Sequence, residues 1–267
     1  SKVLIFSDIH IACHKKSTER LDDCLKVLEW VFQTAIDRDI ENIIFLGDLF
    51  HDRTKIDILT LHKTHEVFGK YLSKPTSPHI WLLLGNHDMW YSDKWDIYST
   101  IIMSGWQNVH IIDHPQTLKF HKQDIDFLPF TENPILDLAN LRNQGCGRIL
   151  FSHLAVDGAI LNSFGTYSDV AVEHDGEMIK IDSQFLSHWE KTLLGHYHAP
   201  QELYIGSPLQ LSFGETGQQK HIAIFDLETL KSEYIVNNFS RKHIITTLDK
   251  LDKQSLDNNF VIIKVED

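Results

Sequence analysis

The chain has 267 residues, 42% of them hydrophobic, and carries 25 basic against 37 acidic side chains, a formal net charge of −12. This length suits one large domain or a domain with an appendage, and no apolar run reaches the roughly 18 residues of a membrane span. The acidic balance argues against a simple nucleic-acid reader, which usually presents a basic face. Bound divalent cations or a basic partner subunit would offset that charge.

Cysteine usage and the first residues indicate a cytosolic protein. The spacing of Cys13, Cys24 and Cys146 supports neither a disulfide framework nor a thiolate zinc site. The first apolar run, residues 3–6, is too short for a signal peptide. The missing initiator Met suggests a processed or tagged start. We therefore expect a cytoplasmic protein that makes no membrane contact.

The first half of the chain alternates short apolar runs with amphipathic segments. Buried strands are expected at residues 3–6, 43–46 and 80–84. Helices are expected at about 17–38, 57–72 and 97–104, because their apolar side chains keep the helical period. Ser17 and Thr18 suit the cap of the first helix. This order predicts a β-α-β-α-β arrangement with a largely parallel sheet.

The second half consists mainly of short strands joined by turns. They are expected at 110–112, 117–120, 125–130, 149–151, 193–194, 203–205, 210–213, 222–225 and 233–236. We therefore predict an α/β fold with two facing sheets and helices outside. Residues 1–236 would form the main domain. A helix at 248–256 and a strand at 260–265 would begin a small second domain that stops early, within 237–267.

Five polar motifs recur along the chain, most of them directly after an expected strand. They are Ser7-Asp8-Ile9-His10, Gly47-Asp48-Leu49-Phe50-His51-Asp52, Gly85-Asn86-His87-Asp88, Ser152-His153 and Gly195-His196-Tyr197-His198. The carboxyl ends of strands are where open α/β sheets bind ligands. One such motif alone is commonly a turn or a chance pairing. All five in this order supply enough Asp, Asn and His for two adjacent metal ions.

Imidazole and carboxylate ligands without thiolates suit Mn²⁺, Fe²⁺ or Zn²⁺. Asp8 and His10 lie two residues apart on a segment expected to be extended, so both side chains would point the same way. His196 and His198 repeat this spacing. Asp48 follows a glycine that permits a tight turn, and its two oxygens can bridge two ions.

Such a centre would act on a phosphoryl group. Two ions about 3.5–4 Å apart clamp it and activate hydroxide for in-line attack. The leaving oxygen then needs a proton, and His87, beside Asn86, is the natural general acid. Asp88 would fix the tautomer of His87.

Features near the motifs allow two interpretations each. The aromatic side chains suit a substrate-stacking wall or packing in the core or a dimer; they are Trp90, Tyr91, Trp95 and Tyr98. The basic side chains suit phosphate contacts or solvated loop charge; they are Lys15, Lys16, Arg53 and Lys55. Glu215 would orient a ligand histidine or lie exposed.

The ordered motifs SDIH, GDLFHD, GNHD, SH and GHYH resemble the calcineurin-like metallophosphoesterase superfamily over about residues 1–235. A narrower resemblance is to SbcD-type double-strand-break repair nucleases. It rests on His51 after Phe50 and on Tyr204-Ile205-Gly206-Ser207-Pro208 followed by Ser212-Phe213-Gly214-Glu215. The modest length resembles phage-encoded small subunits of a recombination endonuclease, which would place the chain in the host cytoplasm.

The resemblance implies a four-layer α-β-β-α sandwich with a short capping segment. It implies a two-metal DNA nuclease of recombination or double-strand-break repair, usually Mn²⁺-dependent, with Mg²⁺, Fe²⁺ or Zn²⁺ as alternatives. Its activities would be 3′–5′ exonuclease on duplex ends and endonuclease on single strands. One ion would be held by Asp8, His10, Asp48 and His198, and the other by Asp48, Asn86, His153 and His196.

The resemblance also implies residue roles and partners. His87 would be the catalytic histidine, and His51 would position the phosphate during exonuclease action. A homodimer would form through helices at about 57–72 and 91–104. An SMC-like ATPase of the SbcC type would bind beyond the capping domain, past the end of this chain.

Two other functions remain open. A small-molecule or nucleotide phosphodiesterase, or a protein phosphatase, of the same fold is favoured by the acidity and opposed by His51 and the Gly206-Ser207-Pro208 run. A non-catalytic scaffold on a decayed site is opposed by the filled ligand positions.

Overall fold

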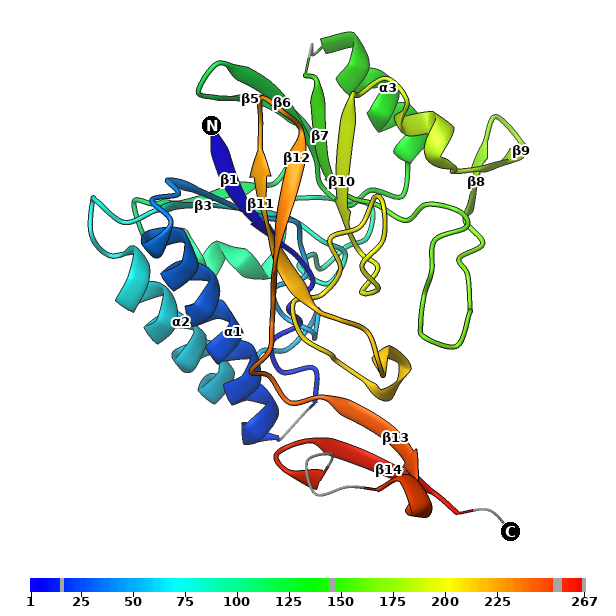
Figure 1. Ribbon diagram of the computed structural model, residues 1–267. Coiled ribbons are helices and arrows are strands. Elements are labelled where there is room, and N and C mark those ends of the chain that lie inside the picture. Colours follow the sequence, from blue (N-terminus) through cyan, green and yellow to red (C-terminus); the bar gives the residue numbers. More distant parts are fainter. Residues whose placement is uncertain (15–16, 145–146, 252–255, 266–267) are drawn as a thin grey trace.

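Two β-sheets face each other in the computed structural model, which describes residues 1–14, 17–144, 147–251 and 256–265 (Figure 1). The first sheet has the order β12 (Lys231–Val236), β11 (His221–Asp226), β1 (Lys2–Phe6), β2 (Asn42–Phe45), β3 (His79–Leu83) and β4 (Val109–Ile112). The second has the order β10 (Lys191–Gly195), β7 (Ile149–His153), β6 (Gln123–Leu128) and β5 (Gln116–Phe120).

The central strands of both sheets are parallel, which brings their carboxyl ends to one edge. Strands β1, β2, β3 and β4 pair in parallel, and β11 joins β1 antiparallel. In the second sheet β10, β7 and β6 are parallel. Three of the five motifs begin within two residues of the ends of β1, β2 and β3, the fourth motif, Ser152-His153, ends β7, and the fifth begins at Gly195, the last residue of β10. The predicted arrangement of chemistry at strand ends is therefore present.

Successive side chains along a strand point to opposite faces of its sheet and belong to different cores. On β1, Leu4 and Phe6 belong to the core beneath the helices, whereas Val3 and Ile5 face the second sheet. This period of two is the expected geometry of a strand that is buried on both sides. Helices α1 (Thr18–Asp37) and α2 (Ile58–Leu72) cover the outer face of the first sheet, side by side in Figure 1.

The second sheet has its own outer helix. On β7, Phe151 faces the first sheet and Leu150 belongs to the core that includes α3 (Pro134–Gln144). The layers are therefore helix, sheet, sheet and helix, which confirms the predicted α/β four-layer fold. The sequence did not predict α3. Its buried residues are only Pro134, Leu138 and Leu141, which are too few to give a clear helical period.

Several expected elements differ. The segments 203–205 and 210–213 are not strands: Tyr204 makes a single bridge to Leu194, and the Leu211 N–H donates to Glu215 rather than to a strand. The expected helix at 97–104 is the 3-10 turn η1 (Ser99–Met103). A hairpin of β8 (Ala171–His174) and β9 (Glu177–Lys180) was not predicted. Further 3-10 turns are η2 (Ser183–Leu186), η3 (Phe213–Glu215) and η4 (Leu248–Lys250).

The last described residues form a parallel pair, β13 (His243–Thr247) and β14 (Phe260–Lys264), next to the start of α1 (Figure 1). Arg241 ties this pair to α1, since its Nη1 lies 3.1 Å from Asp23 and 2.9 Å from the Glu19 carbonyl. The strand expected at 260–265 is thus present. Of the helix expected at 248–256, residues 252–255 lie outside the described residues. Within the described chain, none of the helices has the length and apolar composition to cross a membrane.

Candidate metal centre

The parallel strands bring the predicted ligands together at one sheet edge. A first group contains Asp8, His10 and His198: the Nε2 atoms of His10 and His198 lie 3.0 Å apart, and His10 Nε2 is 3.9 Å from Asp8 Oδ1. Asp48 Oδ2 lies 3.5 Å from the same His10 nitrogen. The possible ligand atoms of Asp8, His10 and His198 all lie within 4.8 Å of one another, close enough to hold one ion.

A second group lies beside the first and shares Asp48 with it. Asn86 Oδ1 is 3.0 Å from His153 Nε2 and 3.0 Å from His196 Nδ1. Asp48 Oδ2 is 3.5 Å from His153 Nε2, the same distance as from His10 Nε2. Asp48 is therefore placed between the two groups, as a bridging carboxylate would be. The structure thus juxtaposes all seven predicted ligands.

Hydrogen bonds fix which nitrogen of two histidines faces the centre. His153 donates from Nδ1 to the Leu46 carbonyl, at 2.6 Å, and His198 donates from Nδ1 to Glu215 Oε1, at 3.0 Å. Each leaves its Nε2 lone pair directed at the other ligands. Metal-binding histidines are commonly oriented by such partners of the second ring nitrogen.

The backbone at the ligands is strained. Asp8, His10, Asp48 and His196 have φ values of 51°, 46°, 65° and 108°. Non-glycine residues rarely adopt positive φ, and such residues cluster at functional sites. The prediction that Asp8 and His10 lie on an extended segment is therefore wrong. Their side chains converge because a left-handed turn follows β1.

Buried negative charge makes the site suitable for cations. Asp8, Asp48 and Asp88 are each at most 2% exposed. Burial and the charge of Asp48 together raise the pKa of Asp88 to about 7. The donors are imidazole nitrogens, carboxylates and one amide, and bound divalent ions would offset the carboxylate charge. This set of donors therefore fits the divalent ions that its residue types suggested, Mn²⁺, Fe²⁺ or Zn²⁺.

Asp88 does not have the role that the sequence suggested. Its carboxylate accepts hydrogen bonds from the backbone N–H groups of Gly85, Asp48 and Leu49, at 2.8–3.0 Å, so it holds the turn that presents Asp48. The Nδ1 atom of His87 lies 2.5 Å from the His51 carbonyl instead. That carbonyl, rather than Asp88, therefore fixes the tautomer of His87 and leaves Nε2 available.

His51 and His87 lie together at the half-exposed edge of the first group. Their rings stack with centroids 5.4 Å apart and an interplanar angle of 26°. The rings of His87 and His10 are perpendicular, with centroids 4.7 Å apart, and His51 Nδ1 is 3.4 Å from His10 Nδ1. Both predicted catalytic histidines therefore lie beside the residues that would hold the first ion.

Two residues at the centre were not predicted from the sequence. Phe130 stacks on the His196 ring at 6.1 Å. Lys220, only 4% exposed, pairs with Glu215 at 2.7 Å. Burial raises the pKa of Glu215, but the His198 hydrogen bond and the Lys220 charge outweigh it and lower that pKa to about 2. The orienting role suggested for Glu215 agrees with this geometry.

The aromatic and basic side chains near the motifs have different environments in the structure. Trp95 donates to the Phe130 carbonyl at 2.8 Å and Tyr98 to Asp113 at 3.1 Å, whereas Trp90 and Tyr91 are exposed. Arg53 donates to the Met89 carbonyl at 3.2 Å. The phosphate contacts suggested for Lys15 and Lys16 lie outside the described residues.

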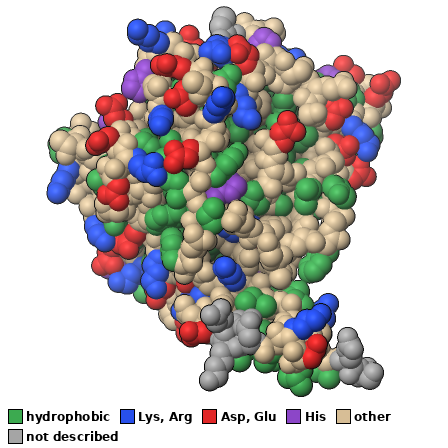
Figure 2. Space-filling view, viewed as in Figure 1, with side chains coloured by type: hydrophobic (Ala, Val, Ile, Leu, Met, Phe, Trp, Pro, Cys, Tyr) green, Lys and Arg blue, Asp and Glu red, His purple; other side chains and the backbone are tan. Residues whose placement is uncertain are grey.

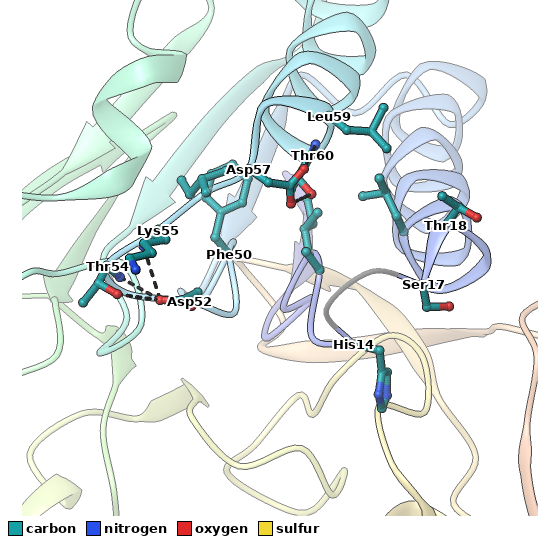
Figure 3. A pocket seen from close by; sticks show the side chains of 14 residues that line it. His14, Ser17, Thr18, Phe50, Asp52, Thr54, Lys55, Asp57, Leu59 and Thr60 are labelled. Carbon is teal, nitrogen blue, oxygen red and sulfur yellow. Dashed lines mark hydrogen bonds between the residues drawn. The ribbon is translucent and has the colours of Figure 1, made fainter.

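A pocket of about 900 Å³ opens beside the centre, between the N-terminal ends of α1 and α2 (Figure 3). Its lining includes Leu21, Phe50 and Leu59, and on its rim Asp52 accepts hydrogen bonds from Thr54 and Lys55. None of the seven ligands is among its described lining residues. The metal chemistry is therefore placed outside this pocket.

Comparison with known proteins identifies the family. The sequence model of the calcineurin-like phosphoesterases matches residues 1–205. The chain belongs to the calcineurin-like phosphoesterase family. This assignment makes the protein a metallophosphoesterase and agrees with the paired ligand groups that share Asp48.

Relatives of this calcineurin-like phosphoesterase include two curated proteins. Exonuclease subunit 1 of Enterobacteria phage T4 is 28% identical over 204 residues, which is 72% of this chain and 55% of that protein. The SbcD component of the SbcCD nuclease from Staphylococcus saprophyticus is 24% identical over 260 residues, 86% of this chain and 66% of that protein. The chain therefore spans about half to two thirds of these relatives. A solved archaeal phosphodiesterase is 14% identical, at a TM-score of 0.45 over 89% of this chain and all of the other.

Proposed function

We propose that the chain is a two-metal DNA nuclease that hydrolyses phosphodiesters in recombination or double-strand-break repair. The observation that carries the proposal is the convergence of two ligand groups on Asp48, with His51 and His87 at their edge. The two curated relatives are named as components of an exonuclease and of a nuclease, which supports a nucleic acid as the substrate. The activities proposed are 3′–5′ exonuclease on duplex ends and endonuclease on single strands.

Each ligand group would hold one divalent ion, with Mn²⁺ as the first candidate given the resemblance. Asp8, His10 and His198 would hold one and Asn86, His153 and His196 the other, with Asp48 between them. When bound, the pair would supply the nucleophile and offset charge on the phosphoryl group. His87, whose Nδ1–H donates to the His51 carbonyl, would act as the acid in its imidazolium form, in which Nε2 also carries a proton; that proton would pass to the leaving oxygen and leave the neutral Nδ1–H tautomer.

The decisive experiment is cleavage of end-labelled duplex and single-stranded DNA with Mn²⁺, Mg²⁺ or EDTA. Bis-p-nitrophenyl phosphate serves as a small diester in parallel. The proposal requires DNA degradation that depends on metal. The proposal would be contradicted if the protein hydrolysed the small diester but left DNA intact, both by itself and with an SMC-like ATPase added. Bound metal with activity on any diester would exclude a non-catalytic scaffold.

The alternative is a small-substrate phosphodiesterase or protein phosphatase, and the net charge of −12 favours it. Figure 2 shows acidic and basic side chains interspersed on the face it displays, without a continuous basic region among the coloured residues. Phosphate neutralisation supplies most nonspecific DNA affinity. The nuclease therefore needs its bound cations or a partner to bind duplex DNA.

His51→Ser separates these two functions. The side chain stacks on His87 but is absent from the seven ligands, so we expect both ions to stay bound. A nuclease of this type should lose its action on duplex ends and keep much of its activity on single strands and the small diester. A small-substrate enzyme should show no such split. Parallel assays of the three substrates with wild type and variant decide between them.

The proposed partners are a second copy of this chain and an SMC-like ATPase of the SbcC type. Exposed apolar side chains near the third motif support a dimer surface; they are Trp90, Tyr91, Ile97 and Ile101, each at least 42% exposed. Ile58 and Leu59 at the start of α2 are also exposed. Sedimentation analysis should give about twice the mass of the chain. We further propose a division into domains at residue 236 and a cytoplasmic location.

A further inference from the structure

Lys220 is a buried cation beside a centre that would itself bind cations. It directly precedes β11 and is 4% exposed. Its Nζ donates to the His198 carbonyl at 2.7 Å, to Gln218 at 2.8 Å and to Ser207 at 2.9 Å, and pairs with Glu215 at 2.7 Å. Burying an ammonium group is costly unless it is paired and fully hydrogen-bonded. This set of contacts meets both conditions.

The two oxygens of Glu215 have different partners. Oε2 faces Lys220 and accepts from the Leu211 N–H at 3.1 Å and the Ser207 hydroxyl at 3.3 Å. Oε1 accepts from His198 Nδ1, at 3.0 Å. The anchored Oε2 thus sets the direction of Oε1, and Oε1 sets the orientation of the imidazole.

The backbone of His198 is held by the same residues. Its carbonyl accepts from Lys220 Nζ and from the Ser207 N–H, at 3.1 Å. Gly206, with φ of 76°, allows this approach, because a side chain there would come within 2.8 Å of the His198 carbonyl oxygen. Both ends of the histidine are therefore fixed by a network that contains Lys220.

We propose that Lys220 is a positioning residue of the metal centre, which clamps His198 through Glu215 on the side chain and directly on the backbone. By this geometry it sets the affinity of the ion that His198 would hold. The ion of His153 and His196 would not depend on it, because His153 is oriented by the Leu46 carbonyl. The inference rests on the proposed metal centre but not on DNA as the substrate.

The test is Mn²⁺ titration of the metal-free full chain by calorimetry, with wild type and Lys220→Met. Wild type should bind two ions. The variant should bind one with unchanged affinity and the other 10- to 100-fold more weakly, the usual cost of losing an outer partner of a ligand. At Mn²⁺ concentrations that fill both wild-type sites but not the weakened one, electron paramagnetic resonance should show coupled ions in wild type and isolated ions in the variant. Equal weakening of both ions, or no change in either, would overturn the proposal.

Matched variants separate positioning from folding. Lys180→Met removes an exposed lysine paired with Asp157 and Asp169 at 3.5 and 3.2 Å and should leave both affinities unchanged. Glu215→Gln keeps the shape of the side chain and should reproduce the selective loss, which decides the question if Lys220→Met does not fold. The double variant should lose less affinity than the sum of the two single losses, because Lys220 and Glu215 share one route to the His198 side chain. A wild type that binds two ions but leaves DNA intact would refute only the nuclease.

Discussion

Asp48→Ala is expected to release both metal ions and to abolish hydrolysis. Its Oδ2 atom lies 3.5 Å from His10 Nε2 in one ligand group and 3.5 Å from His153 Nε2 in the other. Removal of any other ligand weakens one group, whereas removal of Asp48 takes a ligand and a negative charge from each. The remaining donors would then be mostly neutral imidazoles close to one another.

Metal content after dialysis measures this effect. Plasma emission spectrometry should show a fall from about two ions per chain to near zero. Asp124→Ala is the control, because Asp124 lies on the surface and pairs with Lys119, at 3.4 Å. That variant should keep the wild-type content. Full occupancy in Asp48→Ala would exclude the bridging role.

The meeting of the motifs was predictable because the carboxyl ends of parallel strands lie at the same edge of a sheet. Once Val3 and Ile5 are recognised as part of a buried strand, the residues after it must lie at the carboxyl edge. The same holds for the residues that follow β2, β3 and β10. Local periodicity and chain order therefore predicted that the motifs meet at this edge, whereas the resemblance supplied which residue would hold which ion, and neither predicted the left-handed turn that orients Asp8 and His10.

Features that depend on hydrogen bonds between residues far apart in the chain could not be predicted from the sequence. The segment 210–213 has a strand-like composition, but its polar backbone groups are satisfied by side chains: Arg20 donates to the Gln210 carbonyl, and Glu215 accepts from Leu211. Lys220 carries no sequence signal beyond its position five residues after Glu215 and directly before a buried strand. Its burial follows from contacts that only the assembled fold creates.

His87→Ala is expected to remove DNA cleavage while both metal ions stay bound. His87 belongs to neither of the two groups that share Asp48, and its contact with that residue is made by its backbone N–H, at 2.8 Å. Alanine keeps this backbone bond. The variant loses only the imidazole, whose Nδ1–H donates to the His51 carbonyl and whose Nε2 would carry the donated proton when the ring is in its imidazolium form. General acid catalysis commonly contributes about 10²–10⁴-fold, so a loss of that size is expected.

The leaving group distinguishes an acid from a residue that merely shapes the site. A DNA alkoxide needs the proton, whereas p-nitrophenolate leaves without it, so His87→Ala should impair DNA cleavage far more than hydrolysis of bis-p-nitrophenyl phosphate. His188→Ala, at an exposed position beside Trp189, should leave both activities unchanged. Equal loss on both substrates would contradict the acid role, and loss of metal would instead make His87 a ligand. Because the same preparation yields metal content and both rates, proton donation and metal binding are measured independently at one residue.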